Sequence, residues 1–419
     1  MKIRILYLIL IGIFSNLLFV SVSSAANFYV RKGATGANNG SDWSAAWNET
    51  SMINYSMINP GDTIYIAAGT YGALNILTSG TSGKPVTFKR ATNSDHGAAT
   101  GWSSSYDGRV IIDGGGSLAA IGIGEGGSYS AQSYITIDGV TKYGIWLRHA
   151  YYGVRADRGR SNNITLRYLE IGDAASYKMD EDGVQGSGDN LIVEYCYIHD
   201  NDNISTHGDG IQWFQGTNIT FRYNIFKNNG QMFMLTETAW GSDYVNDLNV
   251  YYNVFYNRGG AHYNGISKKL CPQAGHYWHI YNNTFDLEAS SNDGYDNVFS
   301  GEGSCSLMDF KNNAVLYSNA GSVSGVSHSY NGFDNSGQYS VYNIPTETGR
   351  VVAADLGFVN PASADYHLTP SSPLIGKGVN VGLSQDLDGK LVPATPSIGA
   401  YELGGSSSVL LPPANLRVQ

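Results

Sequence analysis

The sequence predicts an all-β fold, a single-stranded right-handed parallel β-helix whose short strands stack in successive coils. One pattern of alternating apolar and polar residues recurs six times between residues 162 and 318. One position of this pattern is occupied in turn by Leu169, Cys196, Asn224, Asn253, Asn283 and Asn313. The steps between these residues are 27, 28, 29, 30 and 30. Strand-like alternation at this period excludes helix-pair repeats, whose apolar residues follow a helical pattern.

The asparagine at four successive copies is a second indication of the same fold. Side-chain amides in one column along a stack hydrogen-bond to the coils above and below, and they stabilise only when neighbouring coils repeat them. The composition is the third indication, because Gly 52, Tyr 30 and 14% charged residues are typical of a turn-dense, strand-rich chain. We therefore expect few helices.

Residues 1–26 are predicted to be a signal peptide. Lys2 and Arg4 precede an apolar run from Ile5 to Val20, and small residues of the kind that signal peptidase accepts extend to Ala26. The alternative is a membrane anchor, but a run of about 16 residues is shorter than a comfortable span. We expect a secreted or cell-surface protein with no transmembrane segment after the signal is cleaved.

Residues 27–345 are predicted to form the β-helix together with an N-terminal cap. The cap has room for one short helix between residues 45 and 57, and it is needed because the open end of a β-helix is an exposed sheet edge. The regular period then fades toward the C-terminus. We predict a small β module over residues 346–403 and a disordered, Gly-, Ser- and Pro-rich tail over residues 404–419.

Export would permit a disulfide, and the chain has three cysteines. Cys196 stands in the repeat at an inward position, so we expect a buried free thiol. Cys271 and Cys305 fall at nearly the same position of adjacent coils, where the strand spacing of about 4.8 Å suits a disulfide. The alternative is that both remain reduced.

The charge restricts the partners. A net charge of −10 and a pI near 5.3 disfavour nucleic acid, whose phosphates require clustered Lys and Arg. An acidic polysaccharide would need bound cations or a local basic cleft on such a protein. We expect a monomer that acts on a polysaccharide.

Two segments carry a family resemblance. Gly61-Asp-Thr-Ile with Gly69-Thr-Tyr, followed by Ser82-Gly-Lys-Pro-Val-Thr, resembles the N-terminal coils of secreted bacterial β-helix proteins that include the chondroitinase B and alginate lyase family. The tail from Tyr366-His-Leu to Ile398-Gly-Ala-Tyr-Glu is similar to a C-terminal module of bacterial surface-associated β-helix proteins. The resemblance implies a pectate-lyase-like fold and export. Lyases, hydrolases, epimerases and noncatalytic proteins share this fold, so activity must come from side chains.

A second motif recurs before the strand pattern and supplies the candidate metal site. It reads Asp180-Glu-Asp182-Gly, His207-Gly-Asp209-Gly and His262-Tyr-Asn264-Gly. Asp182 and Asp209 are one coil apart, and stacking would bring them within about 5 Å, where two carboxylates bind a hard cation such as Ca²⁺ or share a proton. Asp180 is the third candidate ligand. The alternative is a repeated corner, because Asp-Gly is itself a turn signal.

Further candidates surround this motif. Glu237 and Lys268 are predicted in one outward column of adjacent coils. Arg148 and Arg155 would hold sugar carboxylates, unless they only form a solvated face. Trp213 and Trp240 would support sugar rings, unless they are core residues.

Three function classes follow from these residues. In a polysaccharide lyase, Ca²⁺ on the aspartates would activate a uronate, Lys268 would be the base, and His207 or His262 would be the acid. In a glycoside hydrolase, two carboxylates among Asp180, Asp182, Asp209 and Glu237 would act together. A noncatalytic glycan-binding protein would have an aromatic stripe without convergent acid and base groups. The leading hypothesis is the lyase, which cleaves a uronate-containing glycan by β-elimination.

Overall fold

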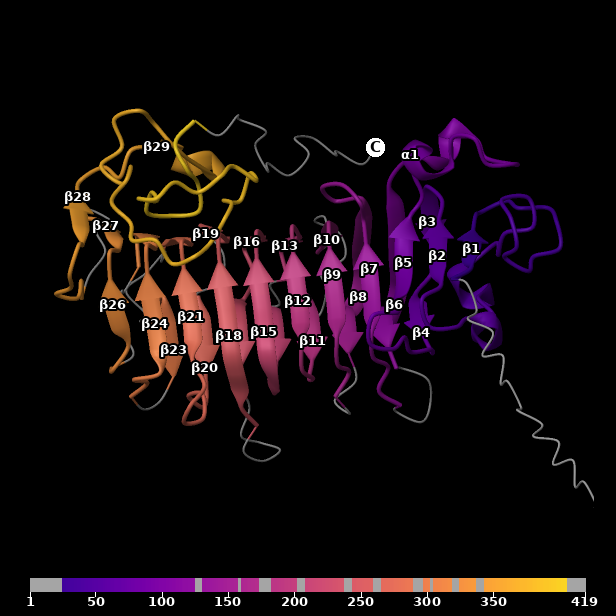
Figure 1. Ribbon diagram of the computed structural model, residues 1–419, viewed down its shortest axis with the longest axis horizontal. Helices are drawn as coiled ribbons and strands as arrows, with labels where there is room; N and C mark the ends of the chain where they lie inside the picture. Colours follow the sequence, from indigo (N-terminus) through magenta and orange to yellow (C-terminus); the bar gives the residue numbers. More distant parts are fainter. Residues whose placement is uncertain are drawn as a thin grey trace, which may run out of the picture.

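The chain forms a single-stranded right-handed parallel β-helix, which confirms the predicted fold class. Its strands lie side by side along the long axis of the molecule, and every strand pair in the solenoid is parallel (Figure 1). The computed structural model describes residues 25–124, 130–156, 160–172, 182–201, 208–236, 243–258, 265–288, 297–301, 304–318, 324–336 and 343–404. Asp180, His207, Glu237, Trp240 and His262, together with residues 1–24 of the predicted signal peptide and residues 405–419 of the predicted tail, lie outside these residues.

Three strands per coil build the solenoid. The first sheet contains, in spatial order, β1 (Asn27–Val30), β2 (Thr63–Ile66), β5 (Val86–Arg90), β7 (Ile135–Asp138), β9 (Ile164–Arg167), β12 (Leu191–Glu194), β15 (Gly216–Arg222), β18 (Val245–Tyr251), β21 (Trp278–Tyr281), β24 (Met308–Lys311) and β26 (Ser327–Ser329). The second strand column contains β3 (Gly69–Tyr71), β6 (Val110–Ile123), β8 (Ile145–Ala156), β10 (Leu169–Ile171), β13 (Tyr197–His199), β16 (Ile225–Lys227), β19 (Val254–Arg258), β22 (Thr284–Glu288), β25 (Ala314–Leu316), β27 (Gly332–Asp334) and β28 (Val351–Ala353). The third contains β4 (Leu74–Ile76), the far halves of β6 and β8, β11 (Val184–Gly186), β14 (Asp209–Trp213), β17 (Gln231–Leu235), β20 (Ile266–Lys268) and β23 (Phe299–Gly301).

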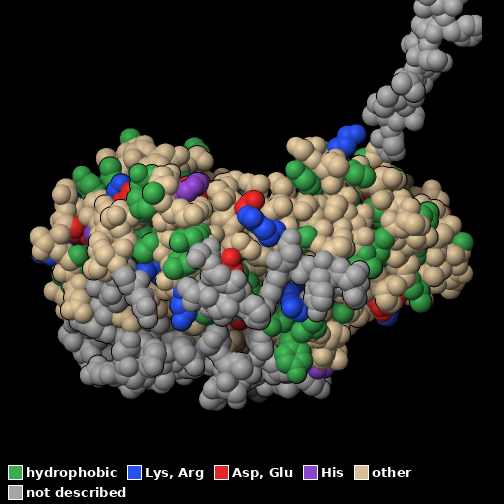
Figure 2. Space-filling model, turned by 90° about the horizontal axis from the view of Figure 1, so that it is seen from below, with side chains coloured by type: hydrophobic (Ala, Val, Ile, Leu, Met, Phe, Trp, Pro, Cys, Tyr) green, Lys and Arg blue, Asp and Glu red, His purple; other side chains and the backbone are tan. Residues whose placement is uncertain are grey.

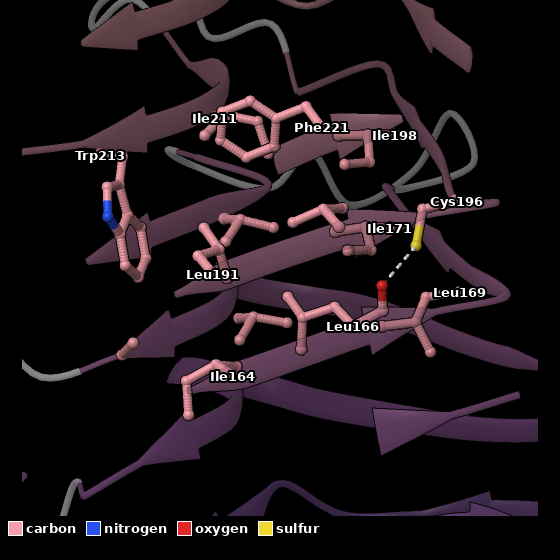
Figure 3. Packing of buried hydrophobic residues seen from close by; sticks show 14 of the residues in the cluster. Ile164, Leu166, Leu169, Ile171, Leu191, Cys196, Ile198, Ile211, Trp213 and Phe221 are labelled. Carbon is pink, nitrogen blue, oxygen red and sulfur yellow. Dashed lines mark hydrogen bonds between the residues drawn. The ribbon is translucent and has the colours of Figure 1, made fainter. Parts of the chain in front are cut away.

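The core is a stack of apolar side chains inside the coils (Figure 3). In the first sheet the register aligns buried residues in one column, which runs Ile64, Phe88, Ile137, Leu166, Val193, Phe221, Val250, Ile280 and Phe310. Phenylalanine rings stack on adjacent coils, with ring centroids 5.2 Å apart for Phe226 and Phe255 and 4.6 Å apart for Phe255 and Phe285. Each such side chain contributes roughly 1.5–3 kcal/mol of burial free energy.

The predicted asparagine ladder is confirmed, and its members are fully buried. The Asn224 backbone N–H and side-chain Nδ2 both donate to Asn253 Oδ1, at 2.9 and 3.0 Å. Asn253 and Asn283 repeat this pattern onto the next coil. Asn331 continues the column, and the carboxylate of Glu347 accepts from it at the end.

Tyrosines at the residue before the ladder explain part of the high tyrosine count. Tyr168, Tyr195, Tyr223 and Tyr252 have φ between 54° and 59°, a left-handed conformation that is uncommon for a bulky residue. Their rings stack along the solenoid, with centroids 5.0 Å apart for Tyr168 and Tyr195 and 4.9 Å apart for Tyr195 and Tyr223. Ring stacking and the ladder together offset the backbone strain that this corner imposes.

Short helices occupy the N-terminal cap. Two 3-10 helices, η1 (Thr50–Met52) and η2 (Tyr55–Met57), stand where one short helix was predicted. The helix α1 (Asn93–His96) and η3 (Ser104–Tyr106) were not predicted. Figure 1 shows this cap at the indigo end of the solenoid.

The C-terminal module packs against the side of the solenoid (Figure 1). It includes β29 (Phe358–Asn360), η4 (Pro361–Ser363) and β30 (Asp365–Leu368), and β29 and β30 pair antiparallel. The solenoid itself continues to β28, which lies beyond the predicted boundary at residue 345. The module covers apolar outward residues of the second strand column, such as Ile225, Val254 and Ala314.

Cysteine placement follows the coil positions. Cys196 is a buried free thiol in the core, as predicted. Cys271 and Cys305 are joined by a disulfide, with Cα atoms 5.7 Å apart.

Figure 2 shows that charged side chains are sparse among the described residues of the face seen from below. Among the described residues, no helix is long and apolar enough to cross a membrane.

Candidate functional site

The structure brings Asp182 and Asp209 together on adjacent coils, as predicted. The Asp209 backbone N–H donates to Asp182 Oδ1 at 2.9 Å, and Gln185 Nε2 donates to Asp182 Oδ2 at 2.9 Å. Both aspartates are buried. Each Asp182 oxygen thus accepts a hydrogen bond from the fold, which favours the corner alternative for this residue. Within the described residues, no three His, Cys, Asp or Glu side chains gather in a group that could hold a metal ion.

Lys268 does not join this aspartate pair. In the third strand column, Leu235 of β17 pairs with Lys268 of β20. Asp209 of β14 pairs with Gln231, which lies four residues before Leu235 in β17. Lys268 is therefore displaced from Asp209 by about 13 Å along the strands and about 10 Å across two coils. It shares a column with the core residues Trp213 and Leu235 and is 3% exposed, so the prediction of an outward column was wrong for Lys268. Burial also lowers the pKa of Lys268.

The predicted sugar-binding residues differ in burial and in contacts. Trp213 is fully buried and donates from its indole Nε1 to the Gly188 carbonyl, so the prediction of a sugar platform was wrong. Arg155 is partly exposed, and its guanidinium carbon lies 5.2 Å from the centre of the Tyr152 ring. Arg148 is also partly exposed, and its Nε donates to Asp113 Oδ2 at 2.9 Å.

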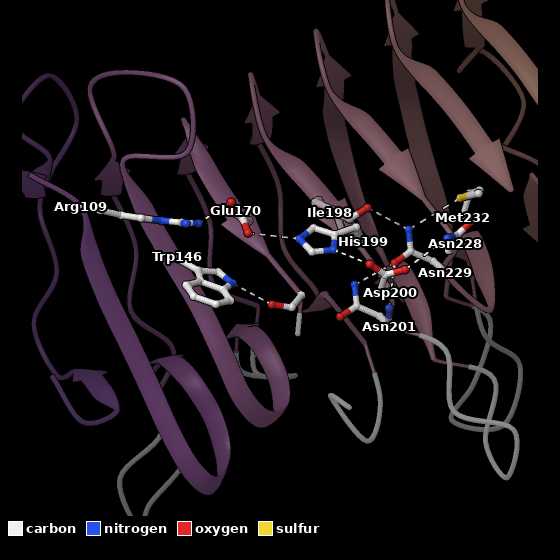
Figure 4. A network of polar contacts seen from close by, with 11 residues as sticks. Arg109, Trp146, Glu170, Ile198, His199, Asp200, Asn201, Asn228, Asn229 and Met232 are labelled. Atoms are coloured by element: carbon white, nitrogen blue, oxygen red, sulfur yellow. Dashed lines mark hydrogen bonds and ion pairs between the residues drawn. The ribbon is translucent and has the colours of Figure 1, made fainter. Parts of the chain in front are cut away.

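A polar network that the sequence did not predict lies on the outer side of β6, β8, β10 and β13 (Figure 4). Outward residues of these strands alternate with core residues, so the register aligns Trp146, Glu170 and Tyr197 on three successive coils. Arg109, just before β6, forms an ion pair with Glu170. The guanidinium carbons of Arg109 and Arg148 lie 4.5 and 4.7 Å from the centre of the Trp146 ring. One indole therefore supports two cations, which its π face attracts.

His199 links two carboxylates in this network. Its Nδ1 lies 2.8 Å from Asp200 Oδ2, and its Nε2 lies 3.4 Å from Glu170 Oε1. Burial alone would lower the pKa of His199, but Asp200 and Glu170 outweigh burial and raise it. Burial alone would raise the pKa of Asp200, but the contacts with His199, Lys227 and Asn228 lower it. The ion pair between His199 and Asp200 holds the Glu170 carboxylate in position beside Arg109.

A cavity of about 430 Å³ adjoins the network. Its walls come from the end of β5, the residues before β6 and the turn between β7 and β8, and they are Arg90, Gly108, Arg109, Thr141, Lys142, Tyr143 and Gly144. Three of these residues are basic, but Arg90 pairs with Asp107 and Arg109 pairs with Glu170, so most of this charge is balanced within the protein. Burial lowers the pKa of Lys142, and Asp388 of the C-terminal module partly offsets this effect.

Comparison with known proteins supports the assignment of the fold. No family model matches the sequence, and no curated protein sequence matches it. The crystal structure of pectate lyase Pel9A matches with a TM-score of 0.51 and 16% identity, over 91% of this chain and 98% of that chain. An alginate lyase from Paenibacillus sp. str. FPU-7 matches with a TM-score of 0.40 and 14% identity, over 73% and 97% of the two chains. A GH136 lacto-N-biosidase from Eubacterium ramulus matches with a TM-score of 0.45 and 12% identity, over 78% and 68%. The match to Pel9A places this chain among parallel β-helix structures.

Proposed function

We propose that the protein binds an acidic, uronate-containing polysaccharide and cleaves it by β-elimination. The observation that carries this proposal is the cavity, where an amine, Lys142, and a guanidinium, Arg109, line the same space. The likeness to a pectate lyase shows the fold alone, so the proposal rests on these side chains. Calcium is a separate proposal: Asp182 and Asp209, with Asp180 outside the described residues, would hold it, and none of the three lines this cavity.

β-Elimination needs two groups that the cavity supplies. A cation must neutralise the uronate carboxylate, because the carbon-bound proton beside it is otherwise too weakly acidic to remove. A base must then take that proton, and the electron pair forms a carbon–carbon double bond as the glycosidic carbon–oxygen bond breaks. The leaving oxygen takes up a proton. In this proposal Arg109 is the cation and Lys142 is the base; partial burial lowers the pKa of its amine, which favours this role.

The proposal replaces Lys268 by Lys142 as the base. Lys268 also has a lowered pKa, but its column belongs to the core and lies away from the arginines. Lys142 lies in the turn between β7 and β8 and is exposed to solvent. A polymer can approach such a turn, whereas it would have to open the core to reach Trp213 or Leu235.

The test is to incubate the purified protein with galacturonan, alginate, chondroitin and neutral glucans, each with calcium and with a chelator. The proposal expects ultraviolet absorbance from unsaturated products on at least one acidic polymer and none on the glucans. New reducing ends without this absorbance would indicate a glycoside hydrolase. Binding without either signal would indicate a noncatalytic glycan-binding protein, and both outcomes would reject β-elimination.

A further inference from the structure

We propose that the cavity beside Trp146 is the subsite for one hexuronate residue, and that Arg109 binds its carboxylate. This inference rests on the proposed function for its choice of ligand, but it concerns binding and can be tested without turnover. It is carried by the difference between two arginines in the same cavity wall, Arg90 and Arg109.

Arg90 uses all its nitrogens inside the protein. Its Nε donates to the Gly139 carbonyl at 2.9 Å, Nη1 donates to Asp107 Oδ1 at 2.8 Å, and Nη2 donates to Thr141 Oγ1 at 3.0 Å. The residue is 7% exposed. Arg90 therefore ties the turn between β7 and β8 to the residues before β6, and we assign it the role of fixing the shape of the cavity.

Arg109, unlike Arg90, has a hydrogen-bond acceptor among the described residues for only one of its three nitrogens. Its Nη2 contacts Glu170, and among the described residues no acceptor hydrogen-bonds to Nε or Nη1. Nε is buried in the protein without a partner there. A ligand in the cavity cannot reach a nitrogen that the protein covers, so Nη1 is the donor that remains for it. A carboxylate is the acceptor that best suits a guanidinium.

The surroundings hold this guanidinium in place. Glu170 fixes one end of the group, and Glu170 itself is kept in position by His199 on the next coil. The Trp146 ring supports the guanidinium carbon at 4.5 Å, and the indole is anchored through its Nε1 to the Gly172 carbonyl at 2.8 Å. The remaining donors of Arg109 are thus held in position before a ligand arrives, which reduces the entropy lost on binding.

The chemistry of the cavity selects an anionic sugar. Guanidinium groups pair with planar carboxylates through charge-assisted hydrogen bonds, and Lys142 adds a second cation in the same wall. A volume of about 430 Å³ lies within the range of small-molecule sites, roughly 300–1,000 Å³. Thr141 adds a hydroxyl to this wall. A neutral sugar would leave Arg109 Nη1 without a charged acceptor.

The experiment measures binding by titration calorimetry with trisaccharides of galacturonate, guluronate and mannuronate, and with maltotriose as the neutral comparison. We expect one or more uronate trimers to bind and maltotriose not to bind. Arg109→Lys keeps a cation beside Glu170 but removes the remaining guanidinium donors. It should weaken uronate binding by about 10-fold to 100-fold, the range for charge-assisted hydrogen bonds.

The control is Lys84→Met, which removes one exposed cation about 20 Å from the cavity along β5. Its binding should equal that of the wild type, and thermal unfolding should show that Arg109→Lys is folded. Equal binding by Arg109→Lys and the wild type would overturn the subsite, as would equal binding of maltotriose or no binding of any uronate. If the wild type binds a uronate but yields no unsaturated product from any polymer, β-elimination fails and the subsite stands.

Discussion

Cys196 occupies the column in which later coils place asparagine, and its surroundings decide its reactivity. The thiol lies in the core, where its Sγ contacts the Glu194 carbonyl at 3.3 Å. Figure 3 shows it among the apolar side chains of neighbouring coils. Burial is the main cause that raises the pKa of Cys196 to about 12, so almost no thiolate forms at neutral pH.

This burial predicts a specific thiol count. In the native, non-reduced protein, a thiol reagent near neutral pH should find no reactive cysteine, because Cys196 is buried and Cys271 is joined to Cys305. After unfolding in denaturant without reductant, one thiol per chain should react. Peptide mapping should then recover Cys271 linked to Cys305. Three reactive thiols after unfolding would contradict the pairing.

His367 gives the C-terminal module a pH dependence. Its ring nitrogens lie 2.6 Å from Asp365 Oδ1 and 2.8 Å from Asp388 Oδ2. Burial by itself would lower the pKa of His367, but the two carboxylates outweigh burial and raise it. A raised folded-state pKa means that the protonated ring stabilises the fold. This contribution is complete below the unfolded pKa of about 6.5 and is lost as the pH rises through the folded pKa.

The raised pKa of His367 fixes how stability should depend on pH. The free energy of unfolding of the wild type should exceed that of His367→Gln by the largest amount near pH 5.5–6, and the difference should shrink by about pH 9. Denaturant unfolding of both proteins across this range measures it. A difference that grows with pH would show that His367 is not protonated in the folded protein.

Along the later coils, from Asn224 to Asn331, the asparagine column replaces apolar packing at one corner. Asn253 donates from Nδ2 to the Phe221 carbonyl at 2.9 Å and accepts at Oδ1 from Asn224. Asn253→Ala should lower the free energy of unfolding by about 1–3 kcal/mol, because buried partners lose their hydrogen bonds. Asn249→Ala, on the partly exposed side of β18, is the matched control and should change it far less. Equal effects would mean that the ladder is incidental.

The spacing of the repeat predicted the coils and the ladder, but it did not predict which face a side chain takes. Successive residues of a strand point to opposite faces, so an error of one position moves a residue from the surface to the core. Lys268 and Trp213 were misplaced in this way, since both fall in the Leu235 column. The Asp182 and Asp209 pair was located correctly because a fixed step of 27 residues relates them.

The cavity was missed because its residues have no common period. Arg90, Arg109 and Lys142 come from the end of one strand, the residue before another and a turn, at steps of 19 and 33 residues. They meet because β5 and β7 are neighbours in the first sheet while β6 and β8 are neighbours in the second column. Only the three-dimensional stacking of coils places them in one wall.

At the scale of the whole molecule, the C-terminal module turns an outer face of the solenoid into a second core. Tyr366 is buried at this contact, and its hydroxyl donates to Asp286 Oδ2 at 2.5 Å. Gln385 of the module also donates to the Tyr195 hydroxyl at 2.7 Å. Asp388 of the same module partly offsets the lowering of the Lys142 pKa, so the module places a carboxylate near the cavity.

This docking predicts the effect of losing one hydroxyl. Tyr366→Phe should lower the free energy of unfolding by about 1–3 kcal/mol, because the buried carboxylate of Asp286 loses a donor. Tyr277→Phe, at an exposed ring just before β21, should leave the free energy of unfolding nearly unchanged. Limited proteolysis should cut the module of Tyr366→Phe faster than that of the wild type. An unaltered Tm and cleavage rate would contradict tight docking.

A crystal structure of the protein with a bound uronate trisaccharide would show directly whether Arg109 and its cavity bind the acidic sugar. We expect a sugar carboxylate within hydrogen-bond distance of Arg109 Nη1, with the ring in the cavity that Lys142 and Thr141 line. A trisaccharide bound elsewhere, for example beside Asp182 and Asp209, with the Arg109 cavity filled by water, would contradict it.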